Sequence, residues 1–149
     1  MARKTLLRSV AALSLALSLL AGALVAGALI APASGSHDPR YRHWGSTDGR
    51  NAVLRFGCNN YKYTYVINPP DREWSAELFL DDPTGETLAS AAFDNFSEPK
   101  RGSATWRICK PSTRPGRFKI RMKITTYVSS QDFRVGWVEP SYFRLRKAS

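Results

Sequence analysis

The stretch Gly116–Tyr127, GRFKIRMKITTY, decides the fold. Apolar and basic side chains alternate along it from Arg117 to Ile124. Because successive side chains of a β-strand point to opposite faces of the sheet, this alternation predicts one long strand with a buried face and a basic face. The buried face would carry Phe118, Ile120, Met122 and Ile124, and the basic face would carry Arg117, Lys119, Arg121 and Lys123.

From Asn51 onward, other short runs of β-branched and aromatic residues recur between turn signals such as NPPD and DDPTG, and no window sustains helical spacing over three turns. Seven or eight such runs predict an all-β fold, a single antiparallel β-sandwich of immunoglobulin-like type. The expected strands besides the opening one are residues 52–56, 61–67, 73–80, 86–93 and 103–109, followed by 133–138 and 142–147 as one kinked strand or two.

The N-terminal segment, residues 1–33, has a basic start, an apolar run and a small-residue site ending at Ala33. This layout predicts a secretory signal helix that is removed before the mature domain. The apolar run is also long enough to cross a bilayer, so an uncleaved signal anchor over residues 10–31 is the alternative. In both cases residues 34–149 are expected to be secreted or extracytoplasmic.

Residues 34–50 are polar, rich in Gly, Ser and Asp, and without periodicity, which predicts a flexible lead-in before a β-sandwich domain at 51–149. Trp44 is the one large apolar side chain of this lead-in that could dock and order it.

The two cysteines are Cys58 and Cys109, and in an exported chain the default expectation is a disulfide between them; a pair of free buried thiols is the alternative. Cys109 has the opposite parity from Trp106 and Ile108. It is therefore expected beyond the strand end or on a bulge, and not squarely in the core.

A resemblance extends over roughly Trp74–Ile124. WSAELFLDDPTGETLAS, and later PGRFKIRM, form the strand, Asp-Pro-x-Gly turn, strand pattern and the Pro-Gly-aromatic strand opening. This pattern resembles extracellular bacterial β-sandwich modules, including the immunoglobulin-like and pre-peptidase C-terminal types. Such modules are accessory domains without catalytic residues, so the resemblance implies a non-enzymatic role and supplies no site residue. The disulfide and the basic last third depart from the pattern.

Positive charge is concentrated late in the chain. Residues 34–149 carry 19 basic and 12 acidic side chains, and 13 of the basic ones follow residue 98. If the 142–147 strand lies beside the opening strand, Arg144 and Arg146 join the basic face. The predicted site for an anionic partner is then Arg117, Lys119, Arg121, Lys123, Arg144 and Arg146. The alternative is a solvated face that Glu73 and Glu77 partly neutralise.

Two further motifs have two interpretations each. Tyr61, Tyr63 and Tyr65 share one strand face, which favours a core position over an exposed stacking platform. The DDPTGE segment from Asp81 carries three carboxylates, but it lacks the residue spacing of a calcium loop and is read as a hairpin turn.

The sequence contains no nucleophile, metalloprotease or phosphate-loop motif, and neither metal nor cofactor is expected. The function expected is a secreted, non-enzymatic binding module for an anionic cell-wall polymer or membrane surface, with nucleic acid not favoured. A structural or protein-interaction module of the cell envelope is the alternative, and a hydrolase is the third reading.

Overall fold

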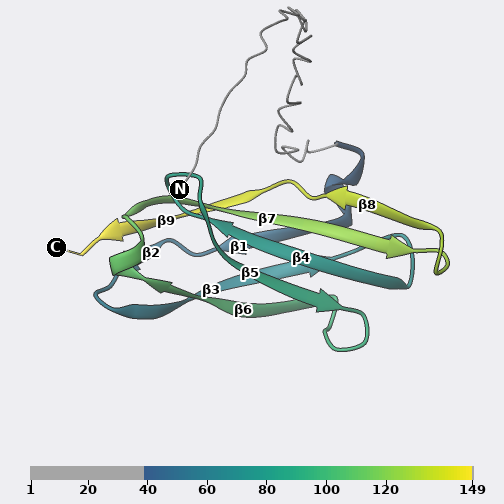
Figure 1. Ribbon diagram of the computed structural model, residues 1–149, viewed down its shortest axis with the longest axis horizontal. Coiled ribbons are helices and arrows are strands. Elements are labelled where there is room, and N and C mark those ends of the chain that lie inside the picture. The colour runs from purple at the N-terminus through teal and green to yellow at the C-terminus, as the bar shows by residue number, and fades with distance from the viewer. Residues whose placement is uncertain (1–38, 149) are drawn as a thin grey trace, which may run out of the picture. The chain divides into compact units, whose positions relative to one another are not determined.

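The computed structural model describes residues 39–148. The predicted signal segment, 1–33, lies outside the described residues. Within residues 39–148, no helix is long and apolar enough to cross a membrane. Along the chain the elements are η1 (Pro39–Trp44), β1 (Gly45–Gly49), β2 (Ala52–Leu54), β3 (Cys58–Ile67), β4 (Glu73–Asp81), β5 (Thr87–Asp94), β6 (Arg101–Cys109), η2 (Lys110–Ser112), β7 (Gly116–Tyr127), β8 (Phe133–Trp137) and β9 (Ser141–Lys147) (Figure 1).

The strands form two sheets, which confirms the all-β prediction. The smaller sheet has the order β1-β3-β6, and the larger has the order β2-β9-β7-β4-β5 with β8 also paired to β7. The pairing is antiparallel throughout, apart from the parallel pair of β2 and β9. The arrangement is sandwich-like, but the larger sheet curves as a half-barrel. Strand β7 is central because β4 lies on one edge of it while β8 and β9 share the other.

The last two strands behave as one interrupted strand along β7. Strand β9 pairs with the first part of β7 and β8 with the last part, and Val138 N–H donates to Met122 O between them. Pro140, which has no N–H to donate, lies in the short connection. The expected kink is therefore present, and it places the basic residues of β9 beside those of β7.

The core confirms the predicted phase of β7. Its apolar residues Phe118, Ile120, Met122 and Ile124 are all at most 1% exposed. Burying each such side chain contributes about 1.5–3 kcal/mol, so a one-residue slip that put them in water would be strongly unfavourable.

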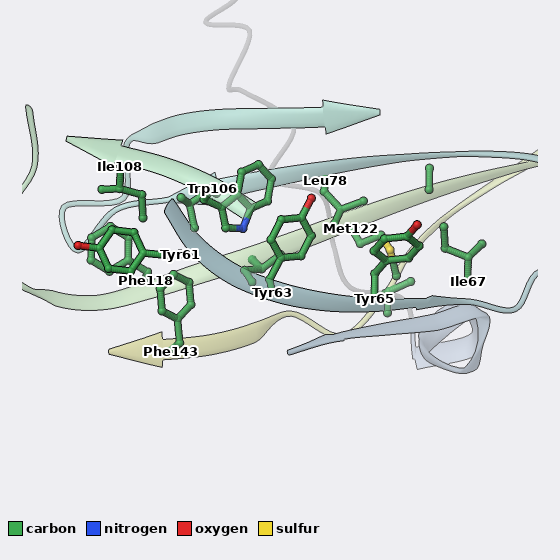
Figure 2. Packing of buried hydrophobic residues seen from close by; sticks show 14 of the residues in the cluster. Tyr61, Tyr63, Tyr65, Ile67, Leu78, Trp106, Ile108, Phe118, Met122 and Phe143 are labelled. Carbon is green, nitrogen blue, oxygen red and sulfur yellow. The ribbon is translucent and has the colours of Figure 1, made fainter. Parts of the chain in front are cut away.

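The three tyrosines of β3 also lie in the core. Tyr61, Tyr63 and Tyr65 are 7%, 2% and 4% exposed (Figure 2). The ring of Tyr63 stacks on Trp106 at 4.5 Å, and the ring of Tyr65 stacks on Phe93 at 4.6 Å. The core reading is confirmed, and the stacking platform is excluded.

The predicted flexible lead-in is wrong from residue 39 onward. Residues 39–44 form the 3₁₀ helix η1, and Gly45–Gly49 form strand β1 against β3. Trp44 is 3% exposed and its carbonyl accepts the Asn68 N–H at 2.6 Å, so its docking orders the segment. The sequence did not predict this strand because it is stabilised by backbone pairing with β3 and carries no apolar alternation.

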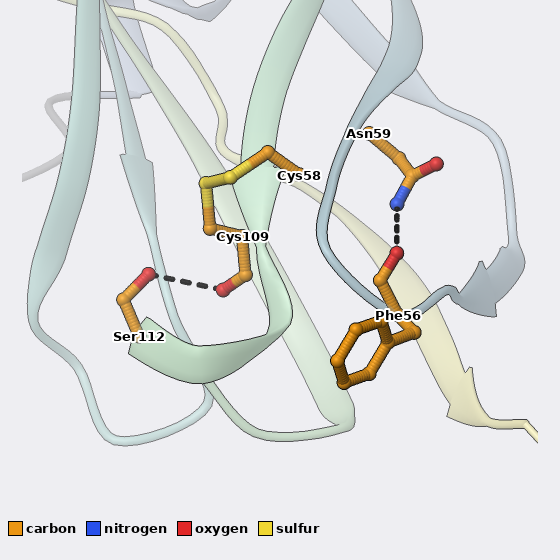
Figure 3. The surroundings of a disulfide bond; sticks show 5 residues. All are labelled: Phe56, Cys58, Asn59, Cys109 and Ser112. Carbon is orange, nitrogen blue, oxygen red and sulfur yellow. Dashed lines mark hydrogen bonds between the residues drawn. A yellow bond between two sulfur atoms is a disulfide. The ribbon is translucent and has the colours of Figure 1, made fainter.

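The disulfide joins Cys58 and Cys109, as expected (Figure 3). The two residues stand directly opposite each other at the ends of β3 and β6, with Cα atoms 3.9 Å apart. Cys109 is half-buried, so it is not squarely in the core, as expected; it is the last residue of its strand, however, and lies neither beyond the strand end nor on a bulge. The bond lies within the smaller sheet and does not link the two sheets.

Candidate functional site

The structure places the six predicted cations on adjacent strands. Arg117, Lys119, Arg121 and Lys123 alternate with the buried residues of β7, and Arg144 and Arg146 alternate with Phe143 and Leu145 of β9. The side chains that alternate with a buried face point away from it. The six residues therefore occupy one outer face, but their surroundings divide them into two groups.

Arg121 is committed to a structural ion pair. Its Nε and Nη2 atoms donate to the two carboxylate oxygens of Asp81 on β4, at 2.7 and 2.9 Å. Its guanidinium also lies 5.1 Å from the ring centre of Phe79 and 5.6 Å from that of Trp137. Burial alone would raise the pKa of Asp81, but hydrogen bonds from Arg121 and Thr87 outweigh it and hold that pKa below its ordinary value.

The neighbouring lysines also face acids. Lys123 forms an ion pair with Glu77, its register partner on β4. Lys119 stands opposite Asp81 in the same strand pair. Acidic residues of β4 therefore neutralise the middle of the basic face, as the alternative interpretation expected. The acids are Glu77 and Asp81, whereas the sequence had suggested Glu77 and Glu73.

The other three cations line a cavity. Arg117, Arg144 and Arg146, together with Asn51, Tyr142 and Phe143, line an open surface pocket of about 490 Å³. No carboxylate among the described residues lines it. Arg117 and Arg144 are direct register partners, and like charges placed opposite each other across two strands repel. An anion between them would relieve that repulsion, so we call this cavity the arginine pocket.

The walls of the arginine pocket are held by specific contacts. The Arg117 guanidinium stacks on the Tyr142 ring, 3.7 Å from its centre. Stacking occupies the face of the guanidinium and leaves its N–H edge free to donate. Asn51 Oδ1 accepts the Arg144 backbone N–H at 2.6 Å, which leaves the Asn51 amide hydrogens as donors. Buried Phe143 completes the lining.

Two residues of the pocket escaped the sequence analysis. Tyr142 precedes buried Phe143 and so shares the outward parity of Arg144, which was a usable signal. Asn51 lies 93 residues from Arg144 in the chain and meets it only because β2 pairs with β9. Nothing in the local sequence of Asn51 indicated that contact.

The carboxylates of the DDPTG turn are engaged within the fold. Asp82 Oδ1 accepts from Thr84 N–H, Thr84 Oγ1 and Glu86 N–H, and Asp82 Oδ2 accepts from Thr113 Oγ1. Burial raises the pKa of Asp82, but these bonds prevail and lower it. The hairpin reading is confirmed, and within residues 39–148 no group of three or more metal-ligating side chains is found.

Comparison with known proteins adds no family assignment. No protein-family model matches the chain, and a search of curated proteins finds no match to it. The site must therefore be argued from its own geometry.

Proposed function

We propose that this protein is a secreted, non-enzymatic binding module that holds an anionic polymer or surface in the arginine pocket. The observation that carries the proposal is that three arginines share a cavity of about 490 Å³ that no carboxylate of the described residues lines. Three of the six cations predicted from the sequence thus remain as ligand-binding residues: Arg117, Arg144 and Arg146. The ion-paired cations of β7 have a structural role.

The chemistry of the pocket favours oxyanions. Guanidinium groups present planar N–H edges that match carboxylate, sulfate and phosphate oxygens in a bidentate manner. Arg117 is fixed by Tyr142, and Asn51 is fixed by the Arg144 backbone, so less ordering is needed on binding. An anionic cell-wall polymer or an anionic membrane surface would supply such groups to an exported domain.

We further propose that the domain is an immunoglobulin-like module. The adjacent pairs β3–β6 in one sheet and β4–β7–β9 in the other correspond to the B–E and C–F–G pairings of that fold. The disulfide differs, because it joins the B and E equivalents within one sheet where immunoglobulins link the two sheets. A disulfide of this kind supports an oxidising, extracytoplasmic location.

A second candidate function is a protein-interaction module of the cell envelope. Exposed apolar residues gather at the β7–β8 hairpin, where Tyr127, Val128, Phe133 and Val135 are between 36% and 58% exposed. Exposed apolar groups of this kind mark contact surfaces for other proteins. This surface lies on the opposite part of β7 from the arginine pocket, so separate variants can test the two functions.

The test measures the affinity of the full-length chain for inorganic polyphosphate and for a soluble polyuronate. The pocket variant is R117Q/R144Q/R146Q, and the matched control is R72Q/K100Q/R101Q, which removes equal charge from exposed positions that line neither the arginine pocket nor its neighbours. Each charge-assisted hydrogen bond that is lost weakens binding about tenfold or more. We expect that loss in the pocket variant, with the control close to the native protein. Equal weakening in both variants, or no binding by the native chain to either polymer, would reject the proposal.

A further inference from the structure

A second basic cavity adjoins the arginine pocket. It encloses about 380 Å³ and shares Asn51 with its neighbour. Its lining includes the cations Arg50, Arg55 and Lys62 and the amides of Asn59 and Asn60. No carboxylate within the described part of the chain lines this cavity either. We call it the asparagine pocket.

The two pockets are neighbours on both sides of β2, where they share lining residues directly or through a third pocket. Asn51, just before the strand, lines both of them. On the other side, a smaller cavity of about 360 Å³ contains Val53, a lining residue of the asparagine pocket, and Arg146, a lining residue of the arginine pocket. Lys147 adds a further cation there. Positive charge therefore continues around β2, and this continuity suits a chain of anions better than a single anion.

The asparagine pocket is held in place by the fold. The Tyr61 hydroxyl accepts the Arg55 N–H at 3.0 Å and donates to Val53 O at 3.2 Å, which fixes the segment after β2 against β3. The disulfide at Cys58 holds the first residue of β3, directly before Asn59 and Asn60. The pocket is therefore largely formed before any ligand arrives.

One side chain in this pocket indicates what the ligand carries besides charge. Asn59 Nδ2 donates to Phe56 O at 3.0 Å, and Figure 3 shows the Asn59 carbonyl oxygen directed away from that bond. This oxygen can only accept a hydrogen bond. Ionised carboxylate, sulfate and phosphate groups cannot donate one, whereas a hydroxyl can. A ligand that satisfies the cations and Asn59 therefore presents both anionic groups and hydroxyl groups.

We infer that the two pockets together bind one linear acidic polysaccharide, which crosses from one to the other over Asn51. The inference rests on the proposed function of the arginine pocket and names the class of its ligand. A deoxyribose-phosphate backbone offers charge but no hydroxyl donor along its length, because deoxyribose lacks the 2′-hydroxyl. Arg117 covers one face of the Tyr142 ring, which leaves at most the other face for stacking against a base. These observations favour a sugar polymer over DNA; RNA, which has a 2′-hydroxyl on each ribose, is distinguished from a polysaccharide by direct comparison of the two affinities.

The test uses oligouronates of increasing length with the full-length chain. The native protein should bind a disaccharide weakly and longer oligomers progressively more tightly, until the oligomer covers both pockets. The variant R50Q/R55Q/K62Q should bind the disaccharide like the native protein and lose about tenfold or more in affinity for the long oligomer. If it binds long oligomers as well as the native protein does, the second subsite is rejected while the arginine pocket stands. If the native chain binds polyphosphate but no oligouronate, the polysaccharide assignment fails while the proposed function stands. If it binds neither polymer, the proposed function itself fails.

A single substitution tests the hydroxyl contact. Asn59→Ala should lower affinity for long oligouronates several-fold and leave affinity for inorganic polyphosphate, which has no hydroxyl groups along its chain, unchanged. Polyphosphate binding thus shows that the pocket of the variant remains folded. Equal losses for both polymers, or tighter binding of single-stranded DNA than of an oligouronate of equal charge, would overturn the polysaccharide assignment.

Discussion

Replacing Arg121 with methionine tests whether this cation stabilises the fold without contributing to ligand binding. Methionine keeps most of the apolar stem between Phe79 and Trp137 but removes both hydrogen bonds to Asp81. The Asp81 side chain is 9% exposed, so its carboxylate would stay buried with Thr87 Oγ1 as its remaining side-chain donor. Stranding a buried charge costs about 3–5 kcal/mol, and Arg121 is itself 25% exposed, so we expect a loss of about 2–3 kcal/mol.

The loss of stability in R121M should depend on pH, and the pKa of Asp81 determines the direction. In the native protein the pKa of Asp81 is lowered, so its stabilisation is present above the unfolded value near 4 and disappears as the pH falls through the folded value. In the variant, Arg121 no longer lowers the pKa of Asp81, so that pKa lies above its native value and the carboxylate is protonated at a higher pH. The stability gap between the two proteins should therefore narrow as the pH falls from 7 towards 3.

The assay is urea unfolding followed by tryptophan fluorescence at both pH values, with linear extrapolation to water. Affinity for the anionic polymers should stay within about threefold of native in the same variant, because Arg121 does not line the arginine pocket. Equal stability of R121M and the native protein at pH 7, or a gap that does not change with pH, would refute the reasoning.

Three other expectations follow from the fold. The double variant C58S/C109S should lose about 4 kcal/mol on the chain-entropy model for a separation of 51 residues, measured as a lower urea midpoint. Gly45→Ala should destabilise by about 1–3 kcal/mol, since a Cβ there would clash with the Val66 carbonyl oxygen; an unchanged melting temperature would contradict this close approach. Burial raises the pKa of Tyr63 to about 12, so a phenolate absorbance step near pH 12 should be absent in Y63F. Because the folded pKa lies above the unfolded value near 10, the stability that this group contributes should be lost as the pH rises from about 10 to about 12.

The parts of the fold that follow a strict period could be predicted from the sequence. The alternation of β7 fixed which residues fill the core, because apolar and charged groups cannot exchange faces without a large cost. The parity of Cys109 indicated that this residue is not squarely in the core. Strand β1 was missed because it carries no apolar alternation. Gly45 lies too close to the Val66 carbonyl oxygen, and Gly49 too close to the Phe143 ring, to accommodate a side chain.

The candidate site was predicted only in part. Local sequence shows which side chains point outward, but it does not show what stands opposite them on other strands. Asp81 neutralises Arg121 across 40 residues of chain, and Asn51 reaches Arg144 across 93. Both contacts are consequences of strand order and register, which the sequence does not encode locally.

The most direct measurement of the central claim is a titration of the arginine side-chain Nε–Hε signals by ¹H–¹⁵N NMR with a soluble polyuronate. The account predicts that the signals of Arg117, Arg144 and Arg146 shift together and saturate at a common affinity, while the signal of Arg121 stays in place. Shifts of equal size at Arg121 and at the three pocket arginines, or shifts that never saturate, would contradict the account.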